Sequence, residues 1–347
     1  MSVKLALARL GQVLALVLSL SLSFLCLEKG GAAASTLDSV KDAGVLRCGV
    51  QEIGPAFSNI DETGRWVGFY TDFCRATAAA ILGDPEAVEF VVVGTDDRFS
   101  ALRDGDFDVL MSSATWTLSR DVDGLTFMPL YLFDGQGFLV HKVSGAKSLV
   151  DLKGGTICVE DHTTSVANVR DYDTSHGMNW TVKPFATVEG AFNAFFEHQC
   201  ESVTTDVMSL ASSWLFLAPN PEDHVILPDR ISKEPLSAVV RSDDVQWSDT
   251  VRWIINALIS AEELGVTSKN VEQMKTSNNP EVRRLLGREG SVGALLGLDE
   301  AFAARALAAM GNYGEIYDRT IKKTLHVERG INNLWTKGGL IWSPPIR

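Results

Sequence analysis

Apolar and polar positions alternate along the chain with two periods, and the alternation predicts strands followed by helices. Residues 44–50, 88–94 and 107–111 are short apolar runs that predict buried strands. Residues 69–82 place apolar side chains on one helical face, and residues 96–105 predict a short helix that ends at a glycine. Strands that alternate with helices are typical of a mostly parallel sheet with both faces covered.

The same pattern restarts in the middle of the chain. Residues 151–160 predict a turn and a strand, residues 188–199 a helix with a phenylalanine-rich apolar stripe, and residues 201–206 another strand. Residues 236–244 read as a strand that returns to the first lobe, so two crossing strands would form a hinge. From about residue 249 the pattern becomes helical.

These patterns predict an α/β protein with two Rossmann-like lobes, two hinge strands and a helical C-terminal extension. The predicted division is a signal peptide at 1–34, the first part of lobe 1 at 35–140, lobe 2 at 141–236, and the lobe 1 return with the extension at 237–347. The signal peptide is indicated by basic residues before an apolar run at 13–25 and by a small-residue cleavage site that ends at Ala34. A retained anchor helix is the alternative interpretation, although the apolar run is short for a membrane span.

Composition narrows the possible partners. The chain has 347 residues, of which 46% are hydrophobic and 22% charged, and its formal net charge is −13. An acidic chain lacks the positive footprint that nucleic acids require, and an anionic membrane surface would repel it. We therefore expect an exported protein that binds no nucleic acid.

The cysteines are consistent with export. Cys26 falls in the predicted signal peptide, and Cys48, Cys74, Cys158 and Cys200 remain. An even number of cysteines in an exported chain indicates two disulfides, with three pairings open, and four buried thiols are the alternative. No C-x-x-C, H-E-x-x-H or complete dinucleotide loop occurs, so the sequence supports no metal site and no cofactor.

A run of hydroxyl side chains ends in an arginine at the close of the third predicted strand. It contains Ser112, Ser113 and Thr115, and Arg120 follows. Ligands of open α/β sheets bind beyond the C-terminal ends of strands, and an arginine fork can hold a carboxylate through two bonds. In lobe 2 the strand at 201–206 ends in Asp206, a carboxylate that could hold an ammonium group. The pattern favours an amino acid bound in a cleft. The alternatives without a ligand are a polar loop for the hydroxyl run and a helix N-cap for Asp206.

The whole of residues 36–347 resembles the periplasmic solute-binding proteins of polar amino-acid ABC transporters, and is most similar to the general L-amino-acid-binding group. The resemblance rests on a set of motifs that are specific only together. They include GVLRCGV (44–50), DRFSALRDGDFDVL (97–110), TWTLSRD (115–121), VTTD (203–206), ISKEPLSAVVR (231–241) and GGLIWSPPIR (338–347). The resemblance implies the two-lobed periplasmic binding protein fold.

The resemblance also implies ligand-binding roles. Arg120, with Ser113 and Thr115, would hold the α-carboxylate, and Thr164 would contact it from lobe 2. Asp206 would hold the α-ammonium group, and Arg98 would read an acidic side chain.

Two departures from the family pattern fall in the expected pocket. Relatives tend to have Arg-Asn-Thr where this chain has Ser112-Ser113-Ala114, and glycine where it has His162. The aromatic that stacks on the ligand near position 54 in simpler members is absent here, with Phe57 and Trp116 nearby. These departures leave the preferred amino acid open.

The expected function is a non-enzymatic, monomeric, periplasmic subunit that captures an L-amino acid by hinge closure and delivers it to a membrane permease. One alternative is an enzyme on the same fold, such as a cyclic amino-acid dehydratase, with Glu160, Asp161 or His162 as the general acid. Another is an amino-acid-sensing subunit. Because a bond between the lobes would obstruct closure, the predicted disulfides are Cys48–Cys74 and Cys158–Cys200, one in each lobe.

Overall fold

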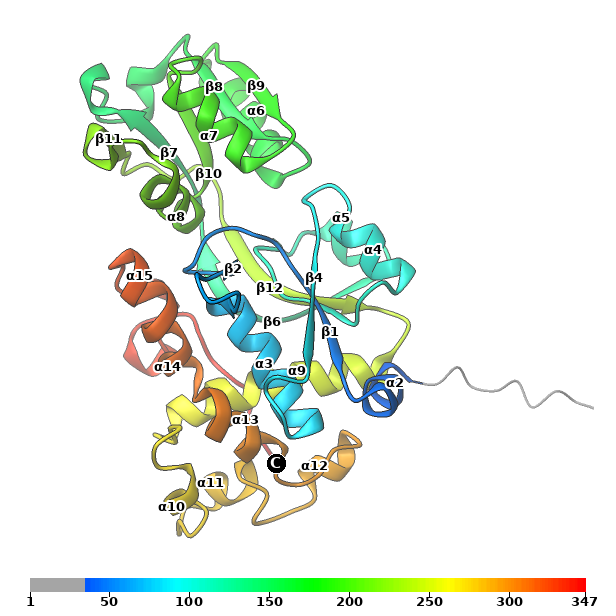
Figure 1. Ribbon diagram of the computed structural model, residues 1–347. Coiled ribbons are helices and arrows are strands. Elements are labelled where there is room, and N and C mark those ends of the chain that lie inside the picture. The colour runs from blue at the N-terminus through cyan, green and yellow to red at the C-terminus, as the bar shows by residue number, and fades with distance from the viewer. Residues whose placement is uncertain (1–34) are drawn as a thin grey trace, which may run out of the picture. The chain divides into compact units, whose positions relative to one another are not determined.

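Two five-stranded sheets organise the residues that the computed structural model describes, residues 35–347 (Figure 1). We call the parts built on these sheets lobe 1 and lobe 2. The first sheet contains β1 (Leu46–Val50), β4 (Val88–Val92), β5 (Val109–Leu110), β6 (Leu125–Asp134) and β12 (Glu234–Arg241). The second contains β7 (Gln136–His141), β8 (Thr156–Glu160), β9 (Thr181–Phe185), β10 (Ser202–Asp206) and β11 (His224–Ile226). A small ribbon pairs β2 (Asn59–Ile60) with β3 (Trp66–Val67).

Both sheets are mixed, which corrects the expectation of a mostly parallel sheet. The first sheet has the order β4-β1-β5-β12-β6, in which β1 is parallel to β4 and β5, whereas β12 is antiparallel to β5 and β6. The second has the order β11-β7-β10-β8-β9, in which β7 is antiparallel to both neighbours and the other pairs are parallel. The antiparallel pairs arise because the chain crosses between the lobes and then runs back.

The two crossings lie side by side. β6 ends at Asp134 and β7 begins at Gln136, and the chain returns to the first sheet with Glu234. The Gln136 backbone N–H donates to the Ser232 hydroxyl at 3.1 Å, so the crossings are hydrogen-bonded to each other. Gly135 lies between the sheets, and a Cβ there would meet the Ser232 carbonyl oxygen at 2.8 Å. The chain passes from one sheet to the other a few residues before the predicted boundaries at 140/141 and 236/237. These domain boundaries stay a prediction.

The helices of each lobe cover its sheet. Lobe 1 has α2 (Thr36–Ala43), α3 (Phe69–Leu82), α4 (Arg98–Asp104) and α5 (Leu118–Asp121). Lobe 2 has α6 (Thr164–His176), α7 (Val188–Phe196) and α8 (Val207–Leu217), and short 3₁₀ turns at Lys142–Ser144, Leu149–Leu152 and Pro221–Asp223. Helix α3 follows the predicted residues 69–82, and all of it but the last residue is buried. It stops at Gly83, whose φ of 82° is a left-handed conformation that glycine adopts without steric cost.

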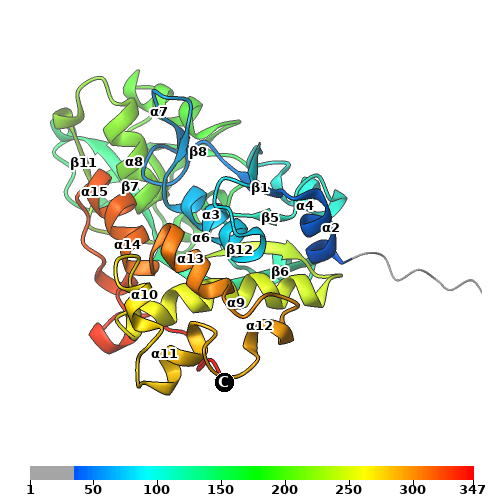
Figure 2. The same ribbon diagram turned by 60° about the horizontal axis from the view of Figure 1, so that its bottom comes forward.

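The C-terminal third packs on lobe 1 (Figure 2). It consists of α9 (Val245–Glu263), α10 (Val271–Met274), α11 (Pro280–Leu285), α12 (Val292–Leu295), α13 (Phe302–Met310), α14 (Tyr313–Tyr317), a π-helical turn (Asp318–Lys322), α15 (Lys323–Leu325) and 3₁₀ turns at Gly330–Asn332 and Trp335–Lys337. Its apolar side chains join those of β1, α3 and β6 in one continuous core. The Tyr313 hydroxyl reaches across this core and donates to the Tyr131 carbonyl at 2.8 Å. The extension therefore stabilises lobe 1 and the strand that leads to the hinge.

Both predicted disulfides are present. Cys48 of β1 is bonded to Cys74 of α3, with the Cα atoms 6.1 Å apart. Cys158 of β8 is bonded to Cys200, just before β10, with the Cα atoms 5.8 Å apart. Each bond lies within one lobe, so neither restricts movement between the lobes.

The predicted signal peptide at 1–34 lies outside the described residues. Within the described part of the chain, no helix is both long and apolar enough to cross a membrane.

Candidate functional site

A cavity of about 480 Å³ opens where strand ends of both lobes meet. Residues that follow β1, β4 and β5 line it from lobe 1, and residues at the ends of β8 and β10 line it from lobe 2. Parallel strands that end at one edge leave backbone groups and helix N-termini facing the same space, which is where ligands bind in open α/β sheets. The cavity volume is within the range of small-molecule sites.

Arg98 is the buried cation of the cavity. It begins α4, is only 4% exposed, and lies over the Phe99 ring with its guanidinium carbon 4.9 Å from the centroid. Its Nη1 donates to Gln51 Oε1 at 2.5 Å, and its Nε has no hydrogen-bond partner in the structure. Burial lowers the pKa of Arg98 to about 10, so the side chain stays charged at neutral pH. A buried guanidinium with a free N–H requires an acceptor, which a ligand can supply.

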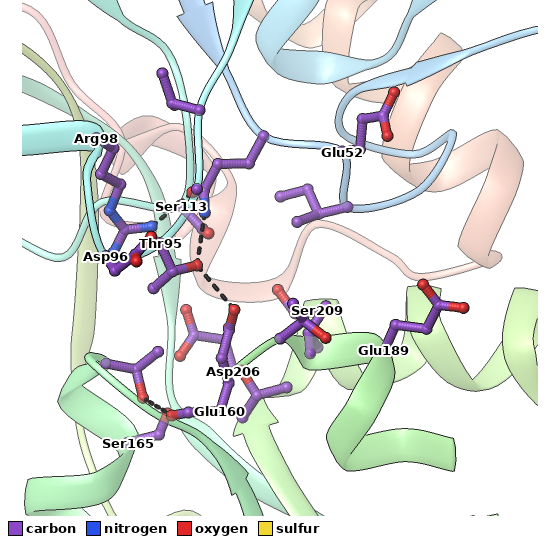
Figure 3. A pocket seen from close by; sticks show the side chains of 18 of the residues that line it. Glu52, Thr95, Asp96, Arg98, Ser113, Glu160, Ser165, Glu189, Asp206 and Ser209 are labelled. Carbon is purple, nitrogen blue, oxygen red and sulfur yellow. Dashed lines mark hydrogen bonds between the residues drawn. The ribbon is translucent and has the colours of Figure 1, made fainter. Parts of the chain in front are cut away.

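Hydrogen bonds lead from Arg98 across the cavity to lobe 2. Gln51 Nε2 donates to Thr95 Oγ1 at 2.9 Å, and the Thr95 hydroxyl donates to Glu160 Oε1 at 2.8 Å. Figure 3 shows the Thr95 and Glu160 side chains approaching each other from the two lobes. Burial raises the pKa of the Glu160 carboxyl. The two lobes are therefore joined by a polar chain inside the candidate site.

Asp206 is the most buried of the carboxylates that line the cavity from lobe 2. It is the last residue of β10, immediately before α8, and is 7% exposed. Burial raises its pKa well above the usual value, and the negative charges of Asp134 and Glu234 add to the rise, while Arg98 and Arg120 oppose it. Within residues 35–347 its carboxylate accepts no hydrogen bond, so a cation or ammonium group is what this position lacks.

The structure brings five of the predicted site residues together at the cavity wall. They are Arg98, Ser113, Thr115, Thr164 and Asp206. The wall also carries the hydroxyls of Thr163, Ser165, Thr187, Thr205, Ser209 and Ser213. Hydroxyl-bearing residues of the two runs identified from the sequence thus line the same cavity: Ser113 and Thr115 from lobe 1, and Thr163, Thr164 and Ser165 from lobe 2.

The other predicted residues are not on the cavity wall. The Arg120 guanidinium is partly buried, donates to the Thr115 carbonyl at 2.9 Å and lies over the Phe99 ring. Phe57 is buried in the core against Tyr70. Trp116 is 43% exposed and stacks on Phe127.

Ser112 and His162 are also placed away from the cavity wall. Ser112 is fully buried, and its backbone exchanges hydrogen bonds with the Tyr131 hydroxyl. His162 is exposed and has a φ of 58°, a left-handed conformation that favours glycine. The family's glycine at this position thus suits the backbone, and the His162 ring takes up no space in the cavity.

Three important residues were missed as ligand-site candidates. Gln51 and Thr95 lie in loops after β1 and β4 and carry no motif of their own. Glu234 is 2% exposed at the start of β12, where it accepts hydrogen bonds from both lobes. Its signals in the sequence were a charge two residues before the apolar strand predicted at 236–244 and its place in the family motif at 231–241.

The mouth of the cavity is acidic. Figure 3 shows Glu52 and Glu189 on facing sides, away from Arg98. Beyond them a second hollow of about 740 Å³ shares five lining residues with the cavity: Glu52, Ile53, Val188, Glu189 and Ser213. Space is therefore available for a ligand longer than the cavity itself. Among the described residues, no group of three or more His, Cys, Asp or Glu side chains could hold a metal ion.

Two lobes joined by two crossings, with polar groups of both lobes facing one cavity, define a clamp that binds a small polar solute. Residues 46–271 match the bacterial extracellular solute-binding proteins, family 3, and the chain belongs to this family.

Curated relatives cover nearly the whole chain. It is 45% identical to the glutamate/glutamine/aspartate/asparagine-binding protein BztA of Rhodobacter capsulatus, over 94% of this chain and 98% of the relative. It is 42% identical to the general L-amino acid-binding periplasmic protein AapJ of Rhizobium johnstonii, over 93% and 96%.

A solved structure agrees with the fold over the same extent. The periplasmic binding protein of an ABC transporter from Brucella ovis, with glutathione bound, superposes with a TM-score of 0.88 at 43% identity. The superposition covers 90% of this chain and all of the other. The two-lobed fold with its helical extension is therefore confirmed, and the relatives are periplasmic proteins, which implies export.

Proposed function

We propose that the protein captures L-amino acids, with a preference for polar or acidic ones, and presents them to the membrane permease of an ABC transporter. The observation that carries the proposal is the presence of two side chains of opposite charge in one cavity: Arg98 on lobe 1, whose Nε has no hydrogen-bond partner, and Asp206 on lobe 2, whose pKa is raised by burial. An amino acid with a polar side chain supplies an ammonium group for one and an acceptor for the other. The names of the curated relatives support the same ligand class.

The proposed mechanism is closure of the clamp. Groups of lobe 1 and lobe 2 reach the same ligand only when the lobes approach, so the ligand favours the closed state through that difference in contacts. We further propose a monomer exported to the periplasm after cleavage behind Ala34, with no enzymatic step.

The proposal is tested by calorimetric titration of the purified protein with all twenty L-amino acids. Binding of glutamate, glutamine, aspartate or asparagine, and recovery of the ligand unchanged, would support it. Failure of every amino acid to bind would overturn it, and a converted product would favour the enzyme.

A peptide ligand is a second candidate. The adjoining hollow extends the cavity, and the Brucella ovis structure holds glutathione, a γ-glutamyl peptide. The acidic residues at the mouth, Glu52 and Glu189, would repel the second carboxylate of such a ligand. We therefore expect glutathione to bind more weakly than glutamine in the same titration.

Replacing Arg98 should alter selectivity rather than abolish binding. In Arg98→Met the buried guanidinium is lost, and we expect roughly 10- to 100-fold weaker binding of glutamate and glutamine, because a charge-assisted hydrogen bond to the ligand disappears. Alanine has no side-chain acceptor and should be nearly unaffected. Calorimetry with the three ligands measures the difference.

The control for this substitution is Arg103→Met on the same helix. Arg103 pairs with Asp123 at 2.8 Å on the surface and does not line the cavity. It should leave all three affinities unchanged. An equal loss of glutamate and alanine binding in Arg98→Met would contradict a side-chain-reading role.

Ligand binding should release a proton at pH values around the raised pKa of Asp206. The pKa of Asp206 is raised well above its usual range in the free protein, and a bound ammonium group lowers it. Affinity should therefore fall as the pH drops below the free-state pKa, by up to about tenfold per pH unit, and be constant above it. Binding enthalpies in phosphate and Tris buffers at pH 6–8 report the proton. Equal enthalpies together with a pH-independent affinity would contradict this linkage.

A further inference from the structure

Glu234 is a buried carboxylate at the point where the chain returns to lobe 1. It begins β12, and its Oε2 accepts from the Thr115 hydroxyl at 2.7 Å and from the Thr164 hydroxyl at 3.2 Å. Its Oε1 accepts from Asn168 Nδ2 at 2.8 Å and from the Ser232 hydroxyl at 2.5 Å. Thr115 belongs to lobe 1, whereas Thr164 and Asn168 lie on α6 of lobe 2, so one side chain is bonded to both lobes.

These bonds determine what the two threonines can offer a ligand. A hydroxyl has one proton and two lone pairs. Thr115 and Thr164 both line the cavity, and both give their proton to Glu234. Only lone pairs remain for the ligand, so each hydroxyl can accept a hydrogen bond but cannot donate one. In this arrangement neither hydroxyl has a proton left for the ligand carboxylate, which the family resemblance implies that they contact.

The negative charge around Glu234 also favours a ligand group that donates hydrogen bonds. Glu234 and Asp134 both add negative potential at Asp206, which also lines the cavity. A ligand group that carries protons and a positive charge satisfies the two hydroxyl acceptors and the carboxylate of Asp206 together. An α-ammonium group has three N–H donors and one positive charge, which match the number and the charge of these three partners.

We propose that Glu234 is a positioning residue of the ligand site: it holds the Thr115 and Thr164 hydroxyls as acceptors for the ligand's ammonium group, beside Asp206. The inference rests on the proposed function and deepens it. It assigns recognition of the ammonium end to both lobes through one carboxylate. A ligand without an ammonium group cannot donate hydrogen bonds to these two hydroxyls from that position.

The test is the isosteric variant Glu234→Gln, assayed with L-glutamate and with glutarate, its analogue without the amino group. The amide nitrogen can donate to the threonine hydroxyls, which then turn their protons toward the cavity. We expect roughly 10- to 100-fold weaker binding of glutamate, and a ratio of glutarate to glutamate dissociation constants at least tenfold smaller than in the parent protein. A merely structural hinge contact would weaken both probes equally and leave the ratio unchanged.

Two further proteins make the result specific. Asp108→Asn removes another buried carboxylate of lobe 1, which is bonded to Arg47 away from the cavity, and should leave the ratio unchanged. The double variant Thr115→Val/Thr164→Val removes the hydroxyls and should lower the ratio by itself. Adding Glu234→Gln to the double variant should change the ratio by less than about twofold, because Glu234 acts on the ligand through the two threonine hydroxyls, which the double variant lacks.

The outcomes separate the two proposals. If the parent binds glutamate and Glu234→Gln keeps its affinity and ratio, the role of Glu234 is overturned and the proposed function stands. If Glu234→Gln fails to fold, an unchanged ratio in the threonine double variant overturns the role. If the parent binds no amino acid, both proposals fall.

Discussion

Asp206→Asn should lose most of its affinity for every amino acid, whatever the side chain. The substitution keeps the shape of the residue but removes the negative charge that faces the ligand's ammonium group. An ammonium group left buried without its counter-charge costs roughly 3–5 kcal/mol, which is about two to four decades in the dissociation constant. Titration with glutamate, glutamine, alanine and leucine measures whether the loss is uniform.

The unliganded variant serves as its own folding control. Ionised Asp206 is costly in the free protein, since burial and the charges of Asp134 and Glu234 all oppose ionisation. The neutral amide removes that cost, so the melting temperature of unliganded Asp206→Asn should equal or exceed that of the parent at pH 8. A variant that binds any of the four ligands as tightly as the parent would exclude Asp206 as the ammonium site.

Arg120 provides the matching test at the carboxylate end. In the structure it is bonded to the Thr115 carbonyl rather than facing the cavity, although Glu234 and Asp206 both act on its charge. If it holds the ligand's carboxylate in the closed clamp, Arg120→Ala should weaken all four ligands by a similar two to four decades. Unchanged affinities would assign the carboxylate to other groups, of which the Ser113 hydroxyl lines the cavity.

Loss of either disulfide should reduce stability without reducing affinity. The bonded cysteines are 26 residues apart in lobe 1 and 42 residues apart in lobe 2. The loop-closure relation then gives roughly 3.5 and 3.9 kcal/mol of stabilisation, mainly through the entropy of the unfolded chain. We expect Cys48→Ala/Cys74→Ala and Cys158→Ala/Cys200→Ala to unfold at clearly lower urea concentrations.

The affinity for glutamate shows whether a disulfide only stabilises its lobe or also positions the ligand site. Each disulfide lies within one lobe, so the double variants, measured well below their unfolding transitions, should bind glutamate within about threefold of the parent. A large loss of affinity in a folded variant would show that the bond positions the site. An unchanged unfolding midpoint would contradict the stabilising role.

The sequence identified the elements whose signals are local. The helices at 69–82 and 188–199 carried a clear apolar face, and α3 and α7 formed there. The antiparallel strands could not be inferred in the same way, because the direction of β12 depends on two crossings between lobes rather than on its own residues. The expectation of a mostly parallel sheet was wrong for this reason.

The residues of the candidate site likewise divide into those that the sequence indicated and those that only the structure revealed. Asp206 stood out as a carboxylate at a strand end, the family resemblance singled out Arg98, and the structure places both at the cavity wall. Glu234 escaped notice because its importance lies in partners 70 and 119 residues away in the chain. Arg120, which the hydroxyl run made prominent, is held by the Thr115 carbonyl instead. Long-range contacts of this kind leave no periodic trace in a sequence.

The hydrogen bond between Thr95 of lobe 1 and Glu160 of lobe 2 is made by groups of the protein alone. A neutral donor to a charged acceptor is worth roughly 1.5–3 kcal/mol, or about one to two decades in an equilibrium constant. Because both partners belong to the protein, that energy favours the closed arrangement of the lobes whether or not a solute is bound. A stronger contact of this kind would slow the release of the bound solute. It would also increase the fraction of protein molecules that are closed without a solute, so that the closed form would indicate a bound solute less reliably.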